Sequence, residues 1–166
     1  MSKRLQPGYS ESLAAMYGKR DKIGDAGEKQ CMHQLSSCGI TVKRVAVPTF
    51  PLSTVQTLQN AGIDILIGDD IVALDVKNNV VNQQFFVETG KGGWLFNPKN
   101  QSDLIIHTSK TNHNLCYWYT RDTGQQNVVQ TQYKMDIFPI HTQKLPLWVN
   151  TGWDTLIEYI KLLELK

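Results

Sequence analysis

Apolar and polar residues alternate along the chain in short blocks that predict a mixed α/β fold. The first block, residues 12–37, favours helix with a break near Gly24, and Gly39 is a plausible cap at its carboxyl end. The last block, residues 154–165, predicts an amphipathic helix with Asp154 in its capping region and an apolar stripe of Leu156, Ile157, Ile160, Leu162 and Leu165. Between these blocks, the pattern predicts a further helical or irregular piece at 53–60 and strands at 41–47, 85–89, 103–108, 115–120 and 128–134.

Residues 62–77 carry the most informative pattern, because they predict two strands joined by a polar turn. Side chains alternate between the two faces of a strand, so one face of this ribbon faces a core and holds only Ile63, Ile65, Ile67, Val72, Leu74 and Val76. The opposite face holds Asp64, Leu66, Ile71, Ala73, Asp75 and Lys77. Three charged groups therefore gather at one end of an otherwise apolar ribbon.

The register of this hairpin decides whether two of those charges meet. A two-residue turn at Asp69 and Asp70 places Leu66 opposite Ala73 and Asp64 opposite Asp75, whereas a three-residue turn shifts the pairing by one. Like charges directly opposite each other destabilise a sheet, and a divalent cation such as Mg²⁺ would explain two carboxylates there. The alternative is that Asp64 marks a strand end and that Asp75 forms a solvated pair with Lys77 on an exposed strand.

Asp64, ten intervening residues and then Asp75-Val76-Lys77 resemble the signature of the PD-(D/E)xK nuclease superfamily, which includes restriction endonucleases, Holliday-junction resolvases and phage exonucleases. Ile63 stands where the family usually has proline. Residues 24–28, Gly-Asp-Ala-Gly-Glu, are similar to the glycine-rich helix whose Glu completes the site in resolvase-like members. The resemblance covers about a third of the chain, residues 24–77, with weaker similarity over 85–106 to the strands that follow in small phage-type members.

The resemblance implies a restriction-endonuclease-like core, an α/β fold with a mixed central β-sheet flanked by helices, in one nuclease domain over residues 1–166. It also implies a DNA endonuclease that hydrolyses phosphodiester bonds with a magnesium-activated water, with Mn²⁺ as a possible substitute. Asp64 and Asp75, with the Val76 carbonyl, would hold the ion, and Glu28 would reach it directly or through water. Lys77 would orient or polarise the attacking water and offset phosphate charge.

Other residues are weaker candidates. Glu88, on a predicted strand, is an extra metal ligand, a partner for Lys77 or a plain surface residue, and Gln83 contacts phosphate or simply enters a strand. Lys91-Gly92-Gly93 lacks the spacing of a nucleotide-binding P-loop and predicts a hairpin turn that can approach a DNA backbone. The aromatic residues could stack on bases, although most are expected in the core: Trp94, Tyr117, Trp118, Tyr119, Trp148 and Trp153.

Charge changes this picture only locally. The 166 residues hold 17 Lys and Arg against 15 Asp and Glu, a net charge of +2 that excludes a polycation held to DNA by bulk charge. Residues 1–44 nevertheless hold eight basic and four acidic side chains, and residues 1–10 are expected to form a loose basic arm. We therefore expect the DNA footprint in this quarter, at Lys19, Arg20, Lys22 and Lys29, with Lys91 added from the later turn.

Compartment and partners follow from what the sequence lacks. No apolar run approaches the length of a membrane span, the start has no signal-peptide pattern, and Cys31, Cys38 and Cys116 are too few for a disulfide scaffold. We therefore expect a cytoplasmic protein with buried thiols, acting on DNA. Cutting both strands would need two subunits, which predicts a homodimer or a higher homo-oligomer. Two alternatives stay open: a non-catalytic DNA-binding module on a nuclease-like fold, and an unrelated α/β protein whose Asp-x-Lys is accidental.

Overall fold

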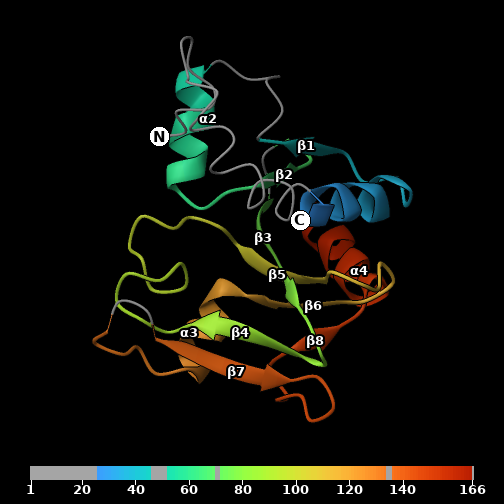
Figure 1. Cartoon of the computed structure of the whole chain (residues 1–166). Coiled ribbons are helices and arrows are strands. Elements are labelled where there is room, and N and C mark those ends of the chain that lie inside the picture. Colours follow the sequence, from blue (N-terminus) through green and yellow to red (C-terminus); the bar gives the residue numbers. More distant parts are fainter. Residues whose placement is uncertain (1–25, 46–51, 70–71, 134–135, 166) are drawn as a thin grey trace, which may run out of the picture.

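The computed structural model describes residues 26–45, 52–69, 72–133 and 136–165. Six strands form the central sheet: β1 (Val42–Arg44), β2 (Ile65–Ile67), β3 (Val72–Val80), β5 (Leu104–Ser109), β6 (Cys116–Thr120) and β8 (Asn150–Thr151). Their order across the sheet is β1-β2-β3-β5-β6-β8, as Figure 1 shows. β3 and β5 run parallel and the other neighbours antiparallel. The predicted mixed α/β fold with a mixed central sheet is therefore confirmed.

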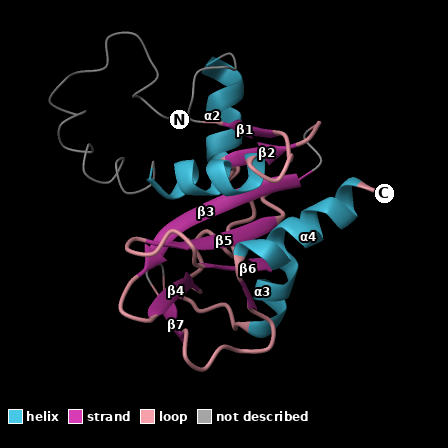
Figure 2. Ribbon diagram, turned by 90° about the vertical axis from the view of Figure 1, so that its right-hand side faces the viewer, coloured by secondary structure: helices cyan, strands magenta, loops and turns pink. Residues whose placement is uncertain are grey.

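Helices and a second sheet cover the two faces of this sheet. The helical segment 26–36 and α4 (Trp153–Glu164) lie on one face, as Figures 1 and 2 show. The other face meets α2 (Leu52–Asn60) near β1 and β2, and a two-stranded sheet of β4 (Gln84–Glu88) and β7 (Ile137–His141) near β5 and β6. The short helix α3 (Arg121–Asn127) follows β6 directly.

Gly39 ends the first described helix as the sequence predicts. Its φ of 84° is a left-handed conformation that L side chains rarely adopt. The Gly39 amide donates to the Ser36 carbonyl at 3.0 Å, and the Ile40 amide donates to the Leu35 carbonyl at 3.2 Å. This pair of bonds is a Schellman cap, and the accompanying apolar contact comes from Leu35 and Ile40, which are both buried in the same cluster.

The helix-covered face of the sheet is mainly apolar. Its core contains Ile65, Ile67, Val72, Leu74 and Val76 from the hairpin, packed with residues of the 26–36 segment and α4. Gly27 allows the first helix to lie close to the sheet. A Cβ at that position would come within 2.8 Å of both the Asn78 Cβ and the Thr108 Oγ1.

The opposite face holds two separate apolar clusters. The first surrounds α2 and includes Val55, Ile63, Leu66 and Ala73. The second lies under β4 and β7 and includes Phe85, Val87, Ile105, Tyr117 and Tyr119. Along β3, Ala73 belongs to the first cluster and Val80 to the second. Asp75 and Lys77 therefore lie between two apolar clusters, not on an exposed strand.

Several predicted elements are wrong or displaced. The strand expected at 128–134 does not form in its described part, where only Thr131 makes an isolated bridge, because Val129 and Tyr133 are exposed and find no strand edge to pair with. The pattern also missed α3, β7 and β8. In α4, Leu162 and Leu165 are exposed, so they do not belong to the apolar stripe, and no side chain caps the helix start at Gly152.

The cysteines also correct one expectation. Cys31 and Cys116 are buried and free, but Cys38 is exposed because it lies in the cap that ends the first helix. Among the described residues, no helix combines the length and apolar character needed to cross a membrane. Residues 1–25, with the predicted basic arm and the break near Gly24, lie outside the described part of the chain.

Candidate functional site

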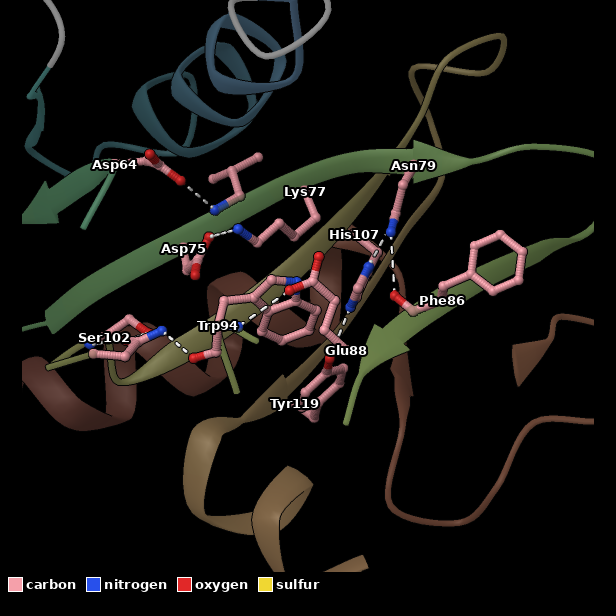
Figure 3. A network of polar contacts seen from close by, with 12 residues as sticks. Asp64, Asp75, Lys77, Asn79, Phe86, Glu88, Trp94, Ser102, His107 and Tyr119 are labelled. Carbon is pink, nitrogen blue, oxygen red and sulfur yellow. Dashed lines mark hydrogen bonds and ion pairs between the residues drawn. The ribbon is translucent and has the colours of Figure 1, made fainter. Parts of the chain in front are cut away.

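The β2–β3 hairpin has the register that a two-residue turn predicts. Leu66 lies opposite Ala73, between the pairs Ile65–Leu74 and Ile67–Val72. Asp64 lies just outside the ladder: its amide donates to the Leu74 carbonyl at 2.8 Å. Its carboxylate Oδ2 accepts the Val76 amide at 2.8 Å and so takes the place of a strand partner beyond the end of β2 (Figure 3). Asp64 therefore contacts the edge of β3 next to Asp75 through its side chain. It does not form a regular cross-strand pair with Asp75.

Asp75 is the most deeply buried acidic residue of the site, with 1% of its surface exposed. Its Oδ1 forms an ion pair with Lys77 Nζ at 3.0 Å. Its Oδ2 is buried and has no hydrogen-bond partner. An unpaired buried carboxylate oxygen is unusual, since such atoms normally find a donor or an ion. The alternative of a solvated Asp75–Lys77 pair on an exposed strand is therefore wrong.

Burial and neighbouring charges shape the ionisation of the site. Burial, followed by the charges of Asp75 and Glu28, raises the pKa of Asp64 well above its usual value, against the effects of Lys77 and the Val76 hydrogen bond. Burial disfavours the charged form of Lys77, but Asp75, Asp64 and Glu88 outweigh it, so the Lys77 pKa is raised. Lys77 is therefore an ammonium at neutral pH, beside carboxylates that repel one another.

Glu28 lies on the helical segment 26–36, as predicted, and its carboxylate is engaged by Arg44. Arg44 Nε donates to Glu28 Oε1 at 3.0 Å, and only 11% and 13% of the Arg44 and Glu28 side chains are exposed. The charge of Glu28 still acts on Asp64. No three His, Cys, Asp or Glu side chains in the described ranges converge as a ready-made metal site. The structure thus brings Asp64, Asp75 and Lys77 together, with Glu28 nearby but ion-paired.

Glu88 and Trp94 form the other side of the Lys77 environment. The Lys77 ammonium lies 5.1 Å from the centre of the Trp94 ring, as Figure 3 illustrates. The Trp94 amide donates to Glu88 Oε2 at 3.2 Å. Glu88 also contributes to the raised pKa of Lys77. Of the three possibilities considered for Glu88, its surroundings fit a partner of Lys77 better than a plain surface residue, and its role as an extra metal ligand stays a prediction.

Sequence reasoning missed His107, which lies beside Lys77 in the β3–β5 ladder. Asn79 Nδ2 donates to the Phe86 carbonyl at 3.2 Å, so Asn79 Oδ1 accepts from His107 Nδ1 at 2.8 Å. His107 Nε2 then accepts from the Tyr119 hydroxyl at 2.8 Å. Burial, assisted by the Lys77 charge, lowers the pKa of His107 from 6.5 to about 3. The imidazole is therefore neutral. The sequence could have pointed to His107 only if the pairing of β5 with β3 had been known, because that pairing places His107 beside Lys77.

The structure describes only some of the remaining predicted residues: Gln83, Lys91 and Lys29. Gln83 and Asn82 have positive φ values in the tight turn between β3 and β4, six residues beyond Lys77, or roughly 20 Å along an extended chain. Lys91 is exposed in a turn closed by a bond from the Gly93 amide to the Gly90 carbonyl, which confirms a turn. It is not the predicted hairpin turn, because the preceding strand β4 pairs with β7. Lys29 is exposed on the first helical segment. Lys19, Arg20 and Lys22 lie outside the described residues.

Comparisons with known protein families, with curated proteins and with solved structures found no match to this chain. The site is therefore interpreted from its own chemistry. A buried carboxylate (Asp75), a half-buried one (Asp64) that accepts the Val76 amide and a lysine paired with Asp75 place acidic oxygens beside a positive charge.

Proposed function

We propose that this chain is a metal-dependent DNA endonuclease of the PD-(D/E)xK type, with a restriction-endonuclease-like core and Mg²⁺ as its natural ion. The observation that carries the proposal is the buried Asp75 Oδ2, which lacks a hydrogen-bond partner beside a second, half-buried carboxylate, Asp64. Two such groups destabilise each other unless a cation lies between them.

The chemistry of the donor set fits a hard divalent ion. Asp64 and Asp75 supply carboxylate oxygens, and the Val76 carbonyl points to the same edge of β3 as its amide, toward Asp64. Mg²⁺ binds through one or two carboxylates and keeps several waters, so two carboxylates and a carbonyl suffice. Glu28 would contribute through a water while it stays paired with Arg44. When bound, the ion would lower the pKa of a water and neutralise charge on the phosphate.

The protein's own groups have distinct tasks. Lys77 keeps a positive charge next to Asp75, where it can orient the attacking water or a phosphate oxygen. Asp64 holds the edge of β3 through the Val76 amide. Lys29 and Lys91 are exposed, and with Lys19, Arg20 and Lys22 they would contact the DNA backbone. One site cuts one strand, so cutting duplex DNA would involve a symmetric dimer.

Plasmid cleavage by the purified full chain with Mg²⁺ or Mn²⁺ tests the proposal. We expect Asp75→Asn and Lys77→Met each to lower the cleavage rate by roughly 100-fold or more, because the first would weaken the binding of the ion and the second removes the positive charge beside the reacting phosphate. The matched controls are Asp154→Asn and Lys144→Met, which change exposed residues of the same types. These controls should cleave like the unmodified chain.

The outcomes separate the proposal from its alternatives. Cleavage that survives both Asp75→Asn and Lys77→Met would contradict it. Salt-sensitive DNA binding without any metal-dependent cutting would instead favour the non-catalytic DNA-binding module. A chain that neither cuts nor binds DNA would favour an unrelated α/β protein.

A further inference from the structure

Trp94 lies against the Lys77 ammonium on a loop whose backbone is fixed on both sides of the ring. The Trp94 amide donates to Glu88 Oε2 at 3.2 Å, and the Trp94 carbonyl accepts from Asn100 Nδ2 at 2.6 Å. The amides of Gly93 and Asn97 donate to the carbonyls of Gly90 and Gly93 at 2.9 and 3.0 Å. The indole is therefore held over Lys77 by the loop and does not lie there by chance side-chain packing.

Gly93 permits this arrangement because it has no side chain. A Cβ at position 93 would lie 2.8 Å from the Glu88 Cβ and 3.1 Å from Glu88 Oε2. Real Cβ atoms essentially never show the first distance, and the second is tighter than most Cβ contacts, so a larger residue would displace Glu88 or the loop. The glycine thus lets the Glu88 carboxylate reach the Trp94 amide.

The indole also lies near a ring that carries no charge. The ring centres of Trp94 and His107 are 5.9 Å apart, and His107 is fixed by Asn79 and Tyr119. Because this imidazole stays neutral, it does not repel the Lys77 ammonium. Lys77 is thus surrounded by carboxylates, a neutral histidine and the face of an indole.

The ion pair with Asp75 would hold Lys77 less tightly if a metal were bound. A divalent cation at Asp75 takes up much of the carboxylate charge, which weakens the attraction across the 3.0 Å contact. The attraction between an ammonium and an indole face comes from the charge distribution of the ring, which a metal at Asp75 would not take up. An indole at 5.1 Å therefore keeps Lys77 in place in the state that matters for cleavage.

We propose that Trp94 is a positioning residue that holds the Lys77 ammonium in the site when a cation occupies Asp75. The catalytic consequence rests on the proposed nuclease function, whereas the contact itself does not. Glu88 and Gly93 serve the same purpose by fixing the loop that carries the ring.

Steady-state cleavage tests the catalytic consequence. Trp94→Leu should lower kcat by about 2- to 30-fold with little change in KM, since about 0.5–2 kcal/mol of positioning is lost. Trp94→Phe should recover part of kcat because it retains an aromatic face. In a Lys77→Met background, Trp94→Leu should cause no further loss. Trp148→Leu is the matched control, because Trp148 is a half-buried tryptophan that packs on Tyr119 in the same cluster.

A second measurement needs no activity. In the full chain labelled with ¹³C-lysine, the ring current of Trp94 should shift the Lys77 ε-methylene resonance, and Trp94→Leu should remove that shift while Trp148→Leu leaves it. The shift should persist when Mg²⁺ is added.

Two results would overturn the proposal. The first is a Lys77 ε-methylene resonance that does not move in Trp94→Leu. The second is a loss of kcat from Trp94→Leu that is as large in the Lys77→Met background as in the unmodified chain. If the unmodified chain does not cleave DNA, the nuclease function fails, and the resonance still decides whether Trp94 holds Lys77.

Discussion

The two faces of β3 are both buried, but they are buried in different ways. On the helix-covered face, Val72, Leu74 and Val76 pack into an apolar core with the first helix and α4. On the other face, Asp75 and Lys77 lie between two apolar clusters and meet Glu88, Trp94 and His107. An apolar face is satisfied by shape and volume, whereas a buried polar face requires a partner for each charge and lone pair.

At β3, the two carboxylates Asp64 and Asp75 have an arrangement that does not serve folding. Asn79, His107 and Tyr119 satisfy one another through a hydrogen-bonded chain. Asp75 Oδ2 has no such partner, and Asp64 is held in a position that raises its pKa. Such an arrangement lowers stability unless a ligand completes it, which is typical of functional sites.

The largest expected effect is a loss of folding stability at low pH. His107 has a pKa of about 3 in the folded chain against 6.5 when unperturbed, so below pH 6.5 the unfolded state binds the extra proton. Above pH 6.5, His107 therefore does not lower the free energy of unfolding. Below pH 6.5, that free energy falls by about 1.4 kcal/mol per pH unit until about pH 3. Urea unfolding of the chain and of His107→Gln across this window measures the difference. Parallel pH curves for the two proteins would contradict the prediction.

The next effect concerns the apolar face. Ile106 is fully buried in the core under the helices, and Ile106→Ala should lower the free energy of unfolding by about 2–5 kcal/mol. Because no titrating group is removed, this loss should be the same at every pH, and Mg²⁺ affinity should not change. Chemical denaturation and metal titration check both statements. The distinction between the two faces would fail if the stability lost in Ile106→Ala varied with pH as strongly as the stability difference between His107→Gln and the unmodified chain.

The smallest effect has the opposite sign. Because the folded-state pKa of Asp64 is raised, the unfolded chain loses this proton first, so the stability contributed by Asp64 falls as the pH rises above 3.8 and the penalty is full once the pH exceeds the folded-state pKa. Asp64→Asn keeps an acceptor for the Val76 amide and should stabilise the metal-free chain by roughly 0.5–2 kcal/mol. Thermal unfolding in EDTA and in Mg²⁺ measures this. Mg²⁺ should raise the Tm of the unmodified chain and not that of Asp64→Asn; a destabilised variant in EDTA would contradict the prediction.

Local physical chemistry made part of the fold and of the candidate site predictable. The Gly39 cap follows from glycine's freedom at positive φ, and the register of β2 on β3 follows from the alternation of apolar residues around a short turn. The same alternation placed Asp75 and Lys77 on one face, where they form an ion pair. These features depend on neighbours within a few residues, so the sequence by itself determined them.

Tertiary contacts decided the rest. Pro139 and the exposed Ile137 give β7 no clear strand pattern, and the strand exists because β4 offers an edge. The stretch at 128–134 has strand-like residues but no edge to pair with. Burial of Asp75, neutrality of His107 and the place of Trp94 over Lys77 all arise when β4, β7 and the 90–96 loop cover that face. Alternation tells which residues share a face, but only the packed structure decides what covers it.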